Sequence, residues 1–505
     1  MIRYTPENQL SIEEFKTPFQ NSLSTDNRWV KLSKLVPWDT FAAKYILMMN
    51  SGFGRPGTSP RVVLGALIIK HKENLSDQGV IEAIQENVYM QYFLGLPEFS
   101  TTPVFDSSLF VAIRQRVGAD VFDALNVDLI HSFSKKSDKS HLANHNKNND
   151  GSATNKGKMQ ADATVADQYI TYPTDSGLLN TSRKHTQRLI DFLYEVTGKK
   201  GVKPRTYRKK LDQAFLNYSK KKKKAKTVHR KMTRTLLESV RRNLGHIDKM
   251  LDLFETTHNH FPLSHKDQRT LWIVKHLYEQ QKEMYDTKKH SHPDRLVSVH
   301  QPHVRAIPRG KTKAQIEFGS KLGVSLDQGF ARINTFSWDA YHEGKDLIPQ
   351  IEAYKDVHGY YPELVLVDKA YATRENRKWL KENNIRITAP PLGRKKKVHA
   401  ETNYQKRKTK REAAERNHIE GKFGQAKNGY RLNQIKAKLR STSESWVSCV
   451  FFIMNLINYQ KKVLFCSFLS RSNVVFLIVY GEIYKLINRP RKDTFQTENF
   501  DFIAA

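Results

Sequence analysis

The sequence predicts an α/β fold, a sheet flanked by helices, preceded by an all-helical region. The run Leu364–Val367 is continuously apolar. Such a run is typical of a strand buried on both faces, as in parallel sheets between helix layers. Upstream of it, apolar residues recur at helical spacing from Val62 to Val117. The first pattern predicts the sheet, and the second predicts a separate helical domain.

The N-terminal domain is expected to cover residues 15–130. A helix begins near Val62, and Ser76 or Asp77 can cap the next one, because short polar side chains accept hydrogen bonds from the first free amides of a helix. A third helix is expected from Ser107. This helix–turn–helix rhythm suits DNA binding, but most helix pairs joined by tight turns never touch DNA, so both interpretations remain open.

A polar linker is predicted at 131–158, because the stretch is rich in Lys, Asn, Ser and Gly. The α/β domain is expected at 159–460, followed by a tail of unknown role at 461–505. Met159–Val165 is compatible with a strand, and Tyr169–Pro173 is expected to form the next one. The segment from about 178 to 290 is helical in pattern and very basic, and we expect it to be an insertion.

Strand-like and helical segments then alternate to residue 427. We expect strands at Leu296–His303, Ile316–Gly319, Leu322–Leu326, Ala331–Trp338 and Ile385–Ala389, and helices at Lys345–His358, Thr373–Asn383 and Arg411–Lys427. A basic loop is expected from Arg394 to Lys410. Near the C-terminus, Trp446–Tyr459 is expected to be a packed helix and Val474–Tyr480 a packed strand too short to span a bilayer.

Charge is the strongest signal in the composition. The chain has 505 residues, with 84 Lys and Arg against 51 Asp and Glu, a net charge of +33. Ribosomal proteins and membrane-surface binders share such a surplus, but at this length it favours an enzyme that acts on nucleic acid, whose phosphates neutralise the charge. Two cysteines and an N-terminus without an apolar segment predict a reduced, cytoplasmic protein with no membrane partner.

Five consecutive lysines stand inside the basic insertion. A lysine run is most often a solvated helix face or a tether. Beside DNA, these side chains would contact backbone phosphates, which position a protein without reading sequence. The candidates for phosphate contacts are Lys220, Lys221, Lys222, Lys223 and Lys224.

Asp368 ends the buried strand, where sites of open α/β sheets form, although a turn or cap residue is the simpler interpretation. Asp162 lies in the first strand after the linker, with Asp167 and Asp175 as rivals that alternation cannot exclude.

A helix near the end of the α/β domain carries a third carboxylate. Arg416, Glu420 and Lys427 are four and seven residues apart, which places them on one stripe of an α-helix. A surface salt-bridge stripe has the same spacing.

Together Asp162, Asp368 and Glu420 suit metal-dependent chemistry at phosphorus. Two Mg²⁺ ions (or Mn²⁺) need several hard oxygen ligands, and one ion activates the attacking hydroxyl while the other stabilises the leaving oxygen. Arg416 and Lys427 would then hold phosphates beside the ions. We therefore expect the three carboxylates to converge, which their distance in sequence does not guarantee.

These residues resemble a known family, the bacterial insertion-sequence transposases of the DDE class. Arg416-x3-Glu420-x6-Lys427 is similar to their Y-x2-R-x3-E-x6-K pattern, Val367-Asp368-Lys369-Ala370-Tyr371 to their D-x-G-Y, and Met159–Thr164 to the region of their first aspartate. The segment Leu64–Arg116 resembles the N-terminal domain common in this group. Two positions depart from the pattern, since Ala413 replaces the tyrosine and Ala370 the glycine.

The resemblance implies an RNase H-like core, which is a mixed sheet flanked by helices, with a helical insertion. It implies that Asp162, Asp368 and Glu420 bind metal, and that the protein cleaves and joins DNA with Mg²⁺. It also implies double-stranded DNA partners, namely the terminal inverted repeats of an element and its target, a homodimer in the synaptic complex, and a bacterial, nucleoid-associated location. The alternative is a catalytically inactive, transposase-derived DNA-binding protein. A zinc-dependent binder using His290, His292, His300 and His303 is disfavoured, because these histidines have no cysteine partners.

Overall fold

The fold is taken from a computed structural model. It describes residues 22–49, 57–141, 155–199, 201–255, 260–308, 316–389 and 402–487. The chain divides into two units, Met1–Asn455 and Leu456–Ala505. Residues 15–21 of the predicted helical domain, residues 394–401 of the predicted basic loop and part of the tail lie outside the described residues. The rest of that loop prediction is wrong, because the helix α14 (Asn403–Gly424) already begins at Asn403 instead of near Arg411.

The N-terminal domain is all helical, as predicted. Ser76 caps α4, with its hydroxyl accepting from the Gly79 amide at 2.9 Å. The apolar residues of α3 are buried along its whole length, so this helix forms the centre of the domain. Its helices are α1 (Arg28–Ser33), α2 (Trp38–Ile46), α3 (Pro60–Lys72), α4 (Asp77–Glu86), α5 (Val88–Phe93), α6 (Leu109–Arg116) and α7 (Ala119–His141). Because α7 continues to His141, the polar linker predicted from residue 131 begins as helix.

The second domain is built on one mixed sheet. Its strands are β1 (Lys158–Asp167), β2 (Arg305–Pro308), β3 (Ile316–Asp327), β4 (Phe330–Ser337), β5 (Leu364–Val367) and β6 (Arg386–Ile387). The order is β2-β3-β1-β5-β6, with β4 also paired to β3. β1 is antiparallel to β3 but parallel to β5, which is itself parallel to β6. The prediction of a parallel strand buried on both faces at 364–367 is confirmed.

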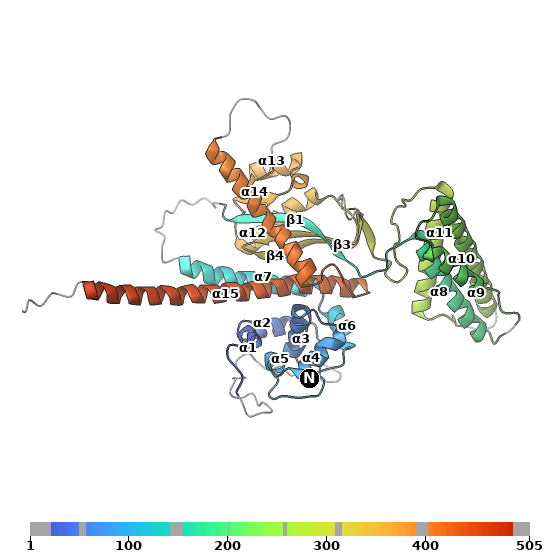
Figure 1. The fold of residues 1–505 in the computed structure, drawn as a ribbon, viewed down its shortest axis with the longest axis horizontal. Helices are drawn as coiled ribbons and strands as arrows, with labels where there is room; N and C mark the ends of the chain where they lie inside the picture. The colour runs from blue at the N-terminus through green and yellow to red at the C-terminus, as the bar shows by residue number, and fades with distance from the viewer. Residues whose placement is uncertain are drawn as a thin grey trace, which may run out of the picture. The chain divides into compact units, whose positions relative to one another are not determined.

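The two faces of the sheet are covered by different helices. Met159, Ala161, Val365 and Val367 pack with Leu347 of α12 (Leu347–His358) in one core cluster, which also includes Leu380 of α13 (Arg374–Glu382). Because side chains alternate along a strand, the residues between them point to the opposite face. There α14 (Asn403–Gly424) packs against β1 and β5, and Figure 1 shows it crossing β1.

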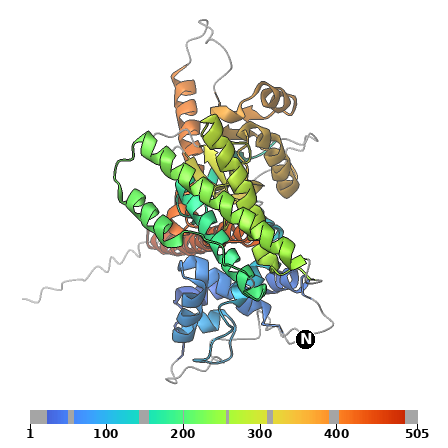
Figure 2. The same ribbon diagram turned by 90° about the vertical axis from the view of Figure 1, so that its right-hand side faces the viewer.

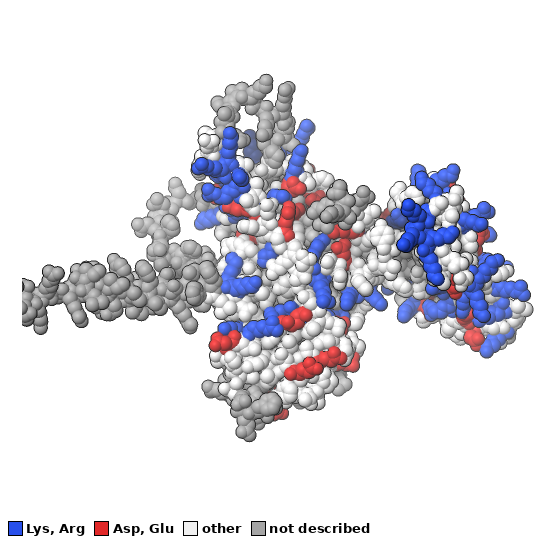
Figure 3. All heavy atoms as spheres, viewed as in Figure 1, with Lys and Arg blue, Asp and Glu red and all other residues white. Residues whose placement is uncertain are grey.

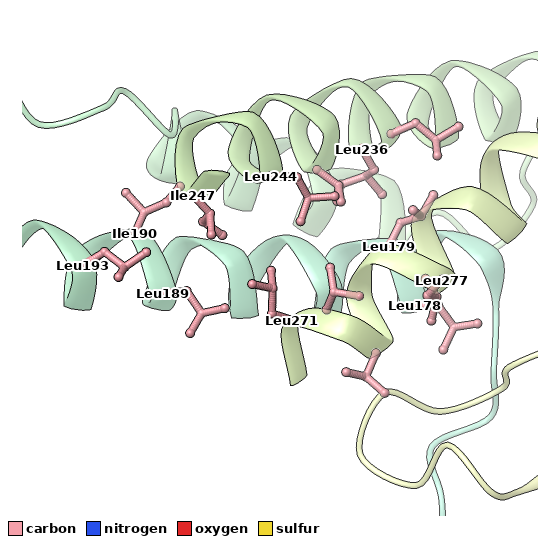
Figure 4. Packing of buried hydrophobic residues seen from close by; sticks show 14 of the residues in the cluster. Leu178, Leu179, Leu189, Ile190, Leu193, Leu236, Leu244, Ile247, Leu271 and Leu277 are labelled. Carbon is pink, nitrogen blue, oxygen red and sulfur yellow. The ribbon is translucent and has the colours of Figure 1, made fainter. Parts of the chain in front are cut away.

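The basic insertion between β1 and β2 is a helical bundle, as predicted. It consists of α8 (Asp175–Val196), α9 (Arg208–Lys220), α10 (Lys226–Glu255) and α11 (His265–Thr287). Figure 2 shows these helices packed side by side. Leucine and isoleucine side chains of α8, α10 and α11 interlock to form the bundle's own core (Figure 4). At its base, Arg295 donates to Asp175 at 2.8 Å and so joins the two ends of the insertion.

A leucine truncation tests this core. Leu189 is fully buried, so Leu189→Ala should destabilise the bundle by about 2–5 kcal/mol through lost contacts and an unfilled cavity. Phe192 lies three residues further along α8 and is 39% exposed, so Phe192→Ala is the matched control and should cost far less. Thermal melts of both variants measure the difference, and equal melting temperatures would contradict the packing described.

Three predicted strands are wrong, and two others are parts of a single strand. Tyr169–Pro173 is not a strand, and only Gln168 makes a bridge there, to Ile435. Leu296–His303 is irregular, and the strand starts at Arg305, beyond Pro302, which cannot donate to a ladder. Ile316–Gly319 and Leu322–Leu326 form one strand. Val474–Tyr480 is helical, within α15 (Arg440–Ile487).

The predicted helix at Trp446–Tyr459 is confirmed as part of α15. None of the helices in the described part of the chain combines the length and apolar character needed to cross a membrane.

Candidate active site

Asp162 and Asp368 lie side by side at the centre of the sheet. Ala161 of β1 pairs in register with Val367 of β5, and the two aspartates are the next residues on these parallel strands. Ala161 and Val367 point toward α12, so alternation directs Asp162 toward the face that α14 covers, and Asp368 follows the same strand geometry. Strand pairing therefore juxtaposes two carboxylates that are far apart in sequence.

Ion pairs show how α14 runs along this face. At the first residue of β1, Lys158 binds Glu415 of α14 at 2.7 Å. At the last residue of β1, Asp167 lies 3.9 Å from Lys427, which follows α14. Arg416 and Glu420 lie between these two anchor points on the helix, as Asp162 does on the strand. The sheet-facing residue Ile419 is fully buried, so its neighbour Glu420 lies at the edge of the same contact.

Arg416 stands between the helix carboxylate and the strand carboxylates. Its guanidinium donates to Glu420 at 3.2 Å, and its charge partly opposes the burial that raises the pKa of Asp162. The side chain of Glu420 is 56% exposed. An exposed pair of this kind contributes little to stability, so Glu420 can exchange Arg416 for another partner at low cost.

Lys427 lies apart from this group. It pairs with Glu317 of β3 at 3.1 Å and with Asp167. The helix continues as a π-helical turn, η4 (Gln425–Gly429), which breaks the regular α-helical stripe expected through Lys427. The ion pairs of Lys427 therefore hold the end of the helix against the sheet.

The carboxyl of Asp162 has a perturbed pKa. Burial raises this pKa to about 6, and the charges of Glu343 and Asp368 add to the rise, while the Ala163 amide and Arg416 oppose it. A carboxyl held among other carboxylates is stabilised in its charged form by a cation. The electrostatics therefore favour a positive ion or a proton at this position.

Two residues near Asp162 were not given a role in the site from the sequence. Glu343, in the 3-10 turn η2 (Glu343–Asp346), influences Asp162 and is held at 2.8 Å by Lys321 of β3. The Tyr371 hydroxyl is buried without a hydrogen-bond partner among the described residues. Burial raises the pKa of this hydroxyl, and the negative charges of Glu343 and Asp162 add to the rise. The Tyr371 position was visible only through the family pattern, and nothing in the spacing marked Glu343.

One buried amide joins the two loops that carry these residues. Asn376 donates at 2.7 Å both to the Gly344 carbonyl, beside Glu343, and to the Tyr371 carbonyl. It is 4% exposed. Asn376 therefore fixes the loop after β4 against the loop after β5.

As placed, no group of three His, Cys, Asp or Glu side chains among the described residues lies close enough to hold a metal ion. Neither the four histidines considered for zinc nor the three carboxylates Asp162, Asp368 and Glu420 form such a group. The chemistry of the donors nevertheless fits a divalent cation, because Glu343 and Asp368 act on the pKa of Asp162 and the buried Tyr371 hydroxyl has no partner among the described residues. The expected convergence of the three carboxylates is therefore not found among the described residues, and Glu420 accepts instead from Arg416.

The lysine run lies in the connection between α9 and α10. Lys220 is the last residue of α9, and the next four lysines are exposed and lie outside the helices. The run therefore forms an exposed connection and not a helix face. Lys224 lies over the Tyr218 ring at 5.4 Å. Figure 3 shows Lys and Arg gathered over this bundle, a surface suited to a polyanion.

Comparisons with known proteins match two parts of the chain. Residues 365–457 match the family described as transposase DDE domain, and residues 17–116 match transposase domain (DUF772). A protein of Rhizobium meliloti named "Uncharacterized protein ORF8 in nfe locus" is 26% identical over 192 residues, which is 35% of this chain and 84% of that protein. No solved structure matches.

The chain thus carries a transposase DDE domain and a transposase N-terminal domain. The first match includes Asp368, Arg416 and Glu420, whereas Asp162 precedes it. The predicted fold, an RNase H-like mixed sheet with helices and a helical N-terminal region, is confirmed. The finer assignment to the group with the Y-R-E-K pattern stays a prediction.

Proposed function

We propose that this protein is a DNA transposase that cleaves the ends of an insertion sequence and joins them to target DNA. The observation that carries the proposal is that Asp162 and Asp368 directly follow the paired residues Ala161 and Val367 of two adjacent strands. They lie beneath a helix that presents Arg416 and Glu420, in a chain with matches to transposase domains. The reaction is phosphodiester hydrolysis followed by transesterification.

In this proposal, Asp162, Asp368 and Glu420 hold Mg²⁺ or Mn²⁺, and Glu343 is a further carboxylate within reach of the same position. The bound metal supplies activation of the attacking hydroxyl and stabilisation of the leaving oxygen. Arg416 binds a phosphate oxygen of the scissile strand once Glu420 no longer occupies its guanidinium. Asn376 keeps the Glu343 and Tyr371 loops in place while DNA binds.

The remaining partners follow from the same proposal. The substrates are the terminal inverted repeats and the target, both double-stranded, and two copies of the chain act together in the synaptic complex. The place of action is the bacterial cytoplasm, at the nucleoid. Lys427, through Glu317 and Asp167, acts as a positioning residue for the end of the catalytic helix.

The test is a nicking and strand-transfer assay on element-end DNA with and without Mg²⁺. We expect product with Mg²⁺ only, and none from Asp368→Asn, which keeps the side-chain shape but loses the charge that binds metal. Binding of end DNA without any metal-dependent product would favour the alternative, an inactive DNA-binding protein derived from a transposase.

Replacing Lys220–Lys224 by Gln should weaken DNA binding about equally for all sequences. Each lost phosphate contact lowers the slope of log affinity against log salt by about 1. Filter binding or fluorescence anisotropy at several salt concentrations measures this slope. Loss of preference for one DNA end, with an unchanged slope, would contradict a phosphate-contact role.

A further inference from the structure

A second polar site lies away from the carboxylates, between the N-terminal domain and the segment that follows the catalytic helix. It is a pocket of about 130 Å³. One wall comes from α3, α4 and α6 and carries Lys70, His71 and Arg114, and the other from residues 430–446, with Trp446. The walls are also joined directly, since the Asn74 amide donates to the Gly429 carbonyl at 2.7 Å.

The pocket wall buries more positive than negative charge. Lys70 is 2% exposed and Arg114 is 5% exposed. Both bind the same carboxylate, Asp77, at 3.0 and 2.7 Å. Burial by itself raises the pKa of Asp77, but the Arg114 hydrogen bond and the Lys70 charge outweigh it and lower this pKa. Two buried cations therefore share one anion.

The mouth of the pocket adds further cations. Arg431 and Lys436 line it and are exposed, and Asp77 is the only acid among the lining residues. Lys70 and Arg114 also lie over the Trp446 ring, at 4.8 and 5.4 Å. Those ring contacts stabilise the cations but do not cancel their charge.

Three buried side-chain nitrogens in the two walls lack partners among the described residues. They are Nε2 of His71, Nε of Arg114 and Nε1 of Trp446. Burial, with the charges of Lys70 and Arg114, lowers the pKa of His71 well below its usual range, so this ring is neutral. Buried polar atoms without partners are costly, and their concentration around a net positive pocket favours an anion that accepts hydrogen bonds.

We propose that this pocket binds a phosphate group, and that a DNA backbone phosphate supplies it. The source rests on the proposed function, whereas the phosphate chemistry does not. A phosphate there would accept from the unpartnered donors and balance the charge of Lys70 and Arg114. It would also tie α3 and α4 to residues 429–437, directly after the catalytic helix, so DNA contact by the N-terminal domain would order that segment.

The first experiment is thermal unfolding of the full chain with increasing inorganic phosphate, against chloride of equal ionic strength. We expect phosphate to raise the melting temperature of the wild type. Lys436→Gln should weaken the apparent affinity about tenfold, through loss of one charge-assisted contact. Lys438→Gln is the matched control, since Lys438 is equally exposed nearby but does not line the pocket.

His71→Phe separates ligand binding from folding. The ring stands edge-on to Trp446 at 5.0 Å, and phenylalanine keeps that packing while removing the unpartnered nitrogen. The variant should be at least as stable as the wild type without phosphate, but with affinity several-fold weaker. No stabilisation of the wild type by phosphate, or equal affinities in wild type, Lys436→Gln and His71→Phe, would overturn the proposal.

The second experiment identifies the source. In protein saturated with duplex DNA, a backbone phosphate should already occupy the pocket, so added inorganic phosphate should cause no further shift. A further shift that His71→Phe abolishes would instead identify a free phosphate compound as the occupant and overturn the DNA assignment. Failure to bind or nick DNA at all would refute the proposed function, while the phosphate titration would still decide the pocket.

Discussion

Glu420→Gln should lower Mg²⁺-dependent nicking by about a thousandfold, equivalent to about 4 kcal/mol of transition-state stabilisation. The amide keeps the side-chain shape but loses the charge that holds a divalent ion. Glu420 is exposed and bound only weakly by Arg416, so folding and binding of end DNA should persist. Single-turnover nicking measures the loss, and anisotropy confirms that binding is intact.

Glu415→Gln is the matched control for this variant. The two glutamates are five residues apart, or about 140° around the helix. The Glu415 carboxylate is bound to Lys158, whose side chain is 52% exposed, so its loss should cost no more than about 1 kcal/mol and leave nicking unchanged. Equal activity in the two variants would mean that Glu420 belongs to a surface salt-bridge stripe, and the proposed mechanism would be wrong.

Asp162→Asn should abolish nicking and yet stabilise the metal-free protein at pH 8. The folded-state pKa of Asp162 is raised by burial from 3.8 to about 6. Ionisation of this carboxyl therefore opposes folding above pH 6, by up to about 3 kcal/mol at 1.36 kcal/mol per pKa unit. Asparagine removes that cost and can still accept from the Ala163 amide, which donates to Asp162 at 2.8 Å.

The pH dependence fixes the sign of this effect. Below pH 3.8 the Asp162 carboxyl is protonated in both the folded and the unfolded wild type, so Asp162→Asn should there be no more stable than the wild type. The free energy of unfolding of Asp162→Asn, relative to the wild type, should then increase as the pH rises through 6. Thermal melts across this range, with EDTA, measure the difference. With Mg²⁺ at pH 8, the wild type alone should gain stability. A variant less stable than the wild type in EDTA at pH 8 would contradict the burial of an unfavourable charge.

Local patterns were sufficient for much of the fold. The apolar run Leu364–Val367 predicted a strand buried on both faces, because only a central strand buries every side chain. Ser76 predicted the start of α4 through its hydroxyl. Tyr169–Pro173 failed because strand formation depends on a partner, and the chain there meets Ile435, whose position no local pattern reveals.

The candidate site was predictable only in part. Asp162 and Asp368 could be proposed because the first lies in a strand and the second directly follows one, but their juxtaposition depends on the register of β1 against β5. Glu343 approaches the site from a loop held by Lys321 and by Asn376, contacts made only in the folded chain. Lys427 does not lie on the predicted helix stripe, because the π-helical turn changes the number of residues per turn after Gly424.

The salt bridge between Arg295 and Asp175 at the base of the bundle has an evolutionary consequence. Because the polypeptide enters and leaves the insertion at neighbouring points, its length and charge can change while the pairing of β1 with β3 is preserved. Lengthening such an excursion adds little to the entropy of closing it, about 0.6 kcal/mol for each doubling. The cationic bundle can therefore change in size and charge while the strands that position Asp162 and Asp368 stay the same.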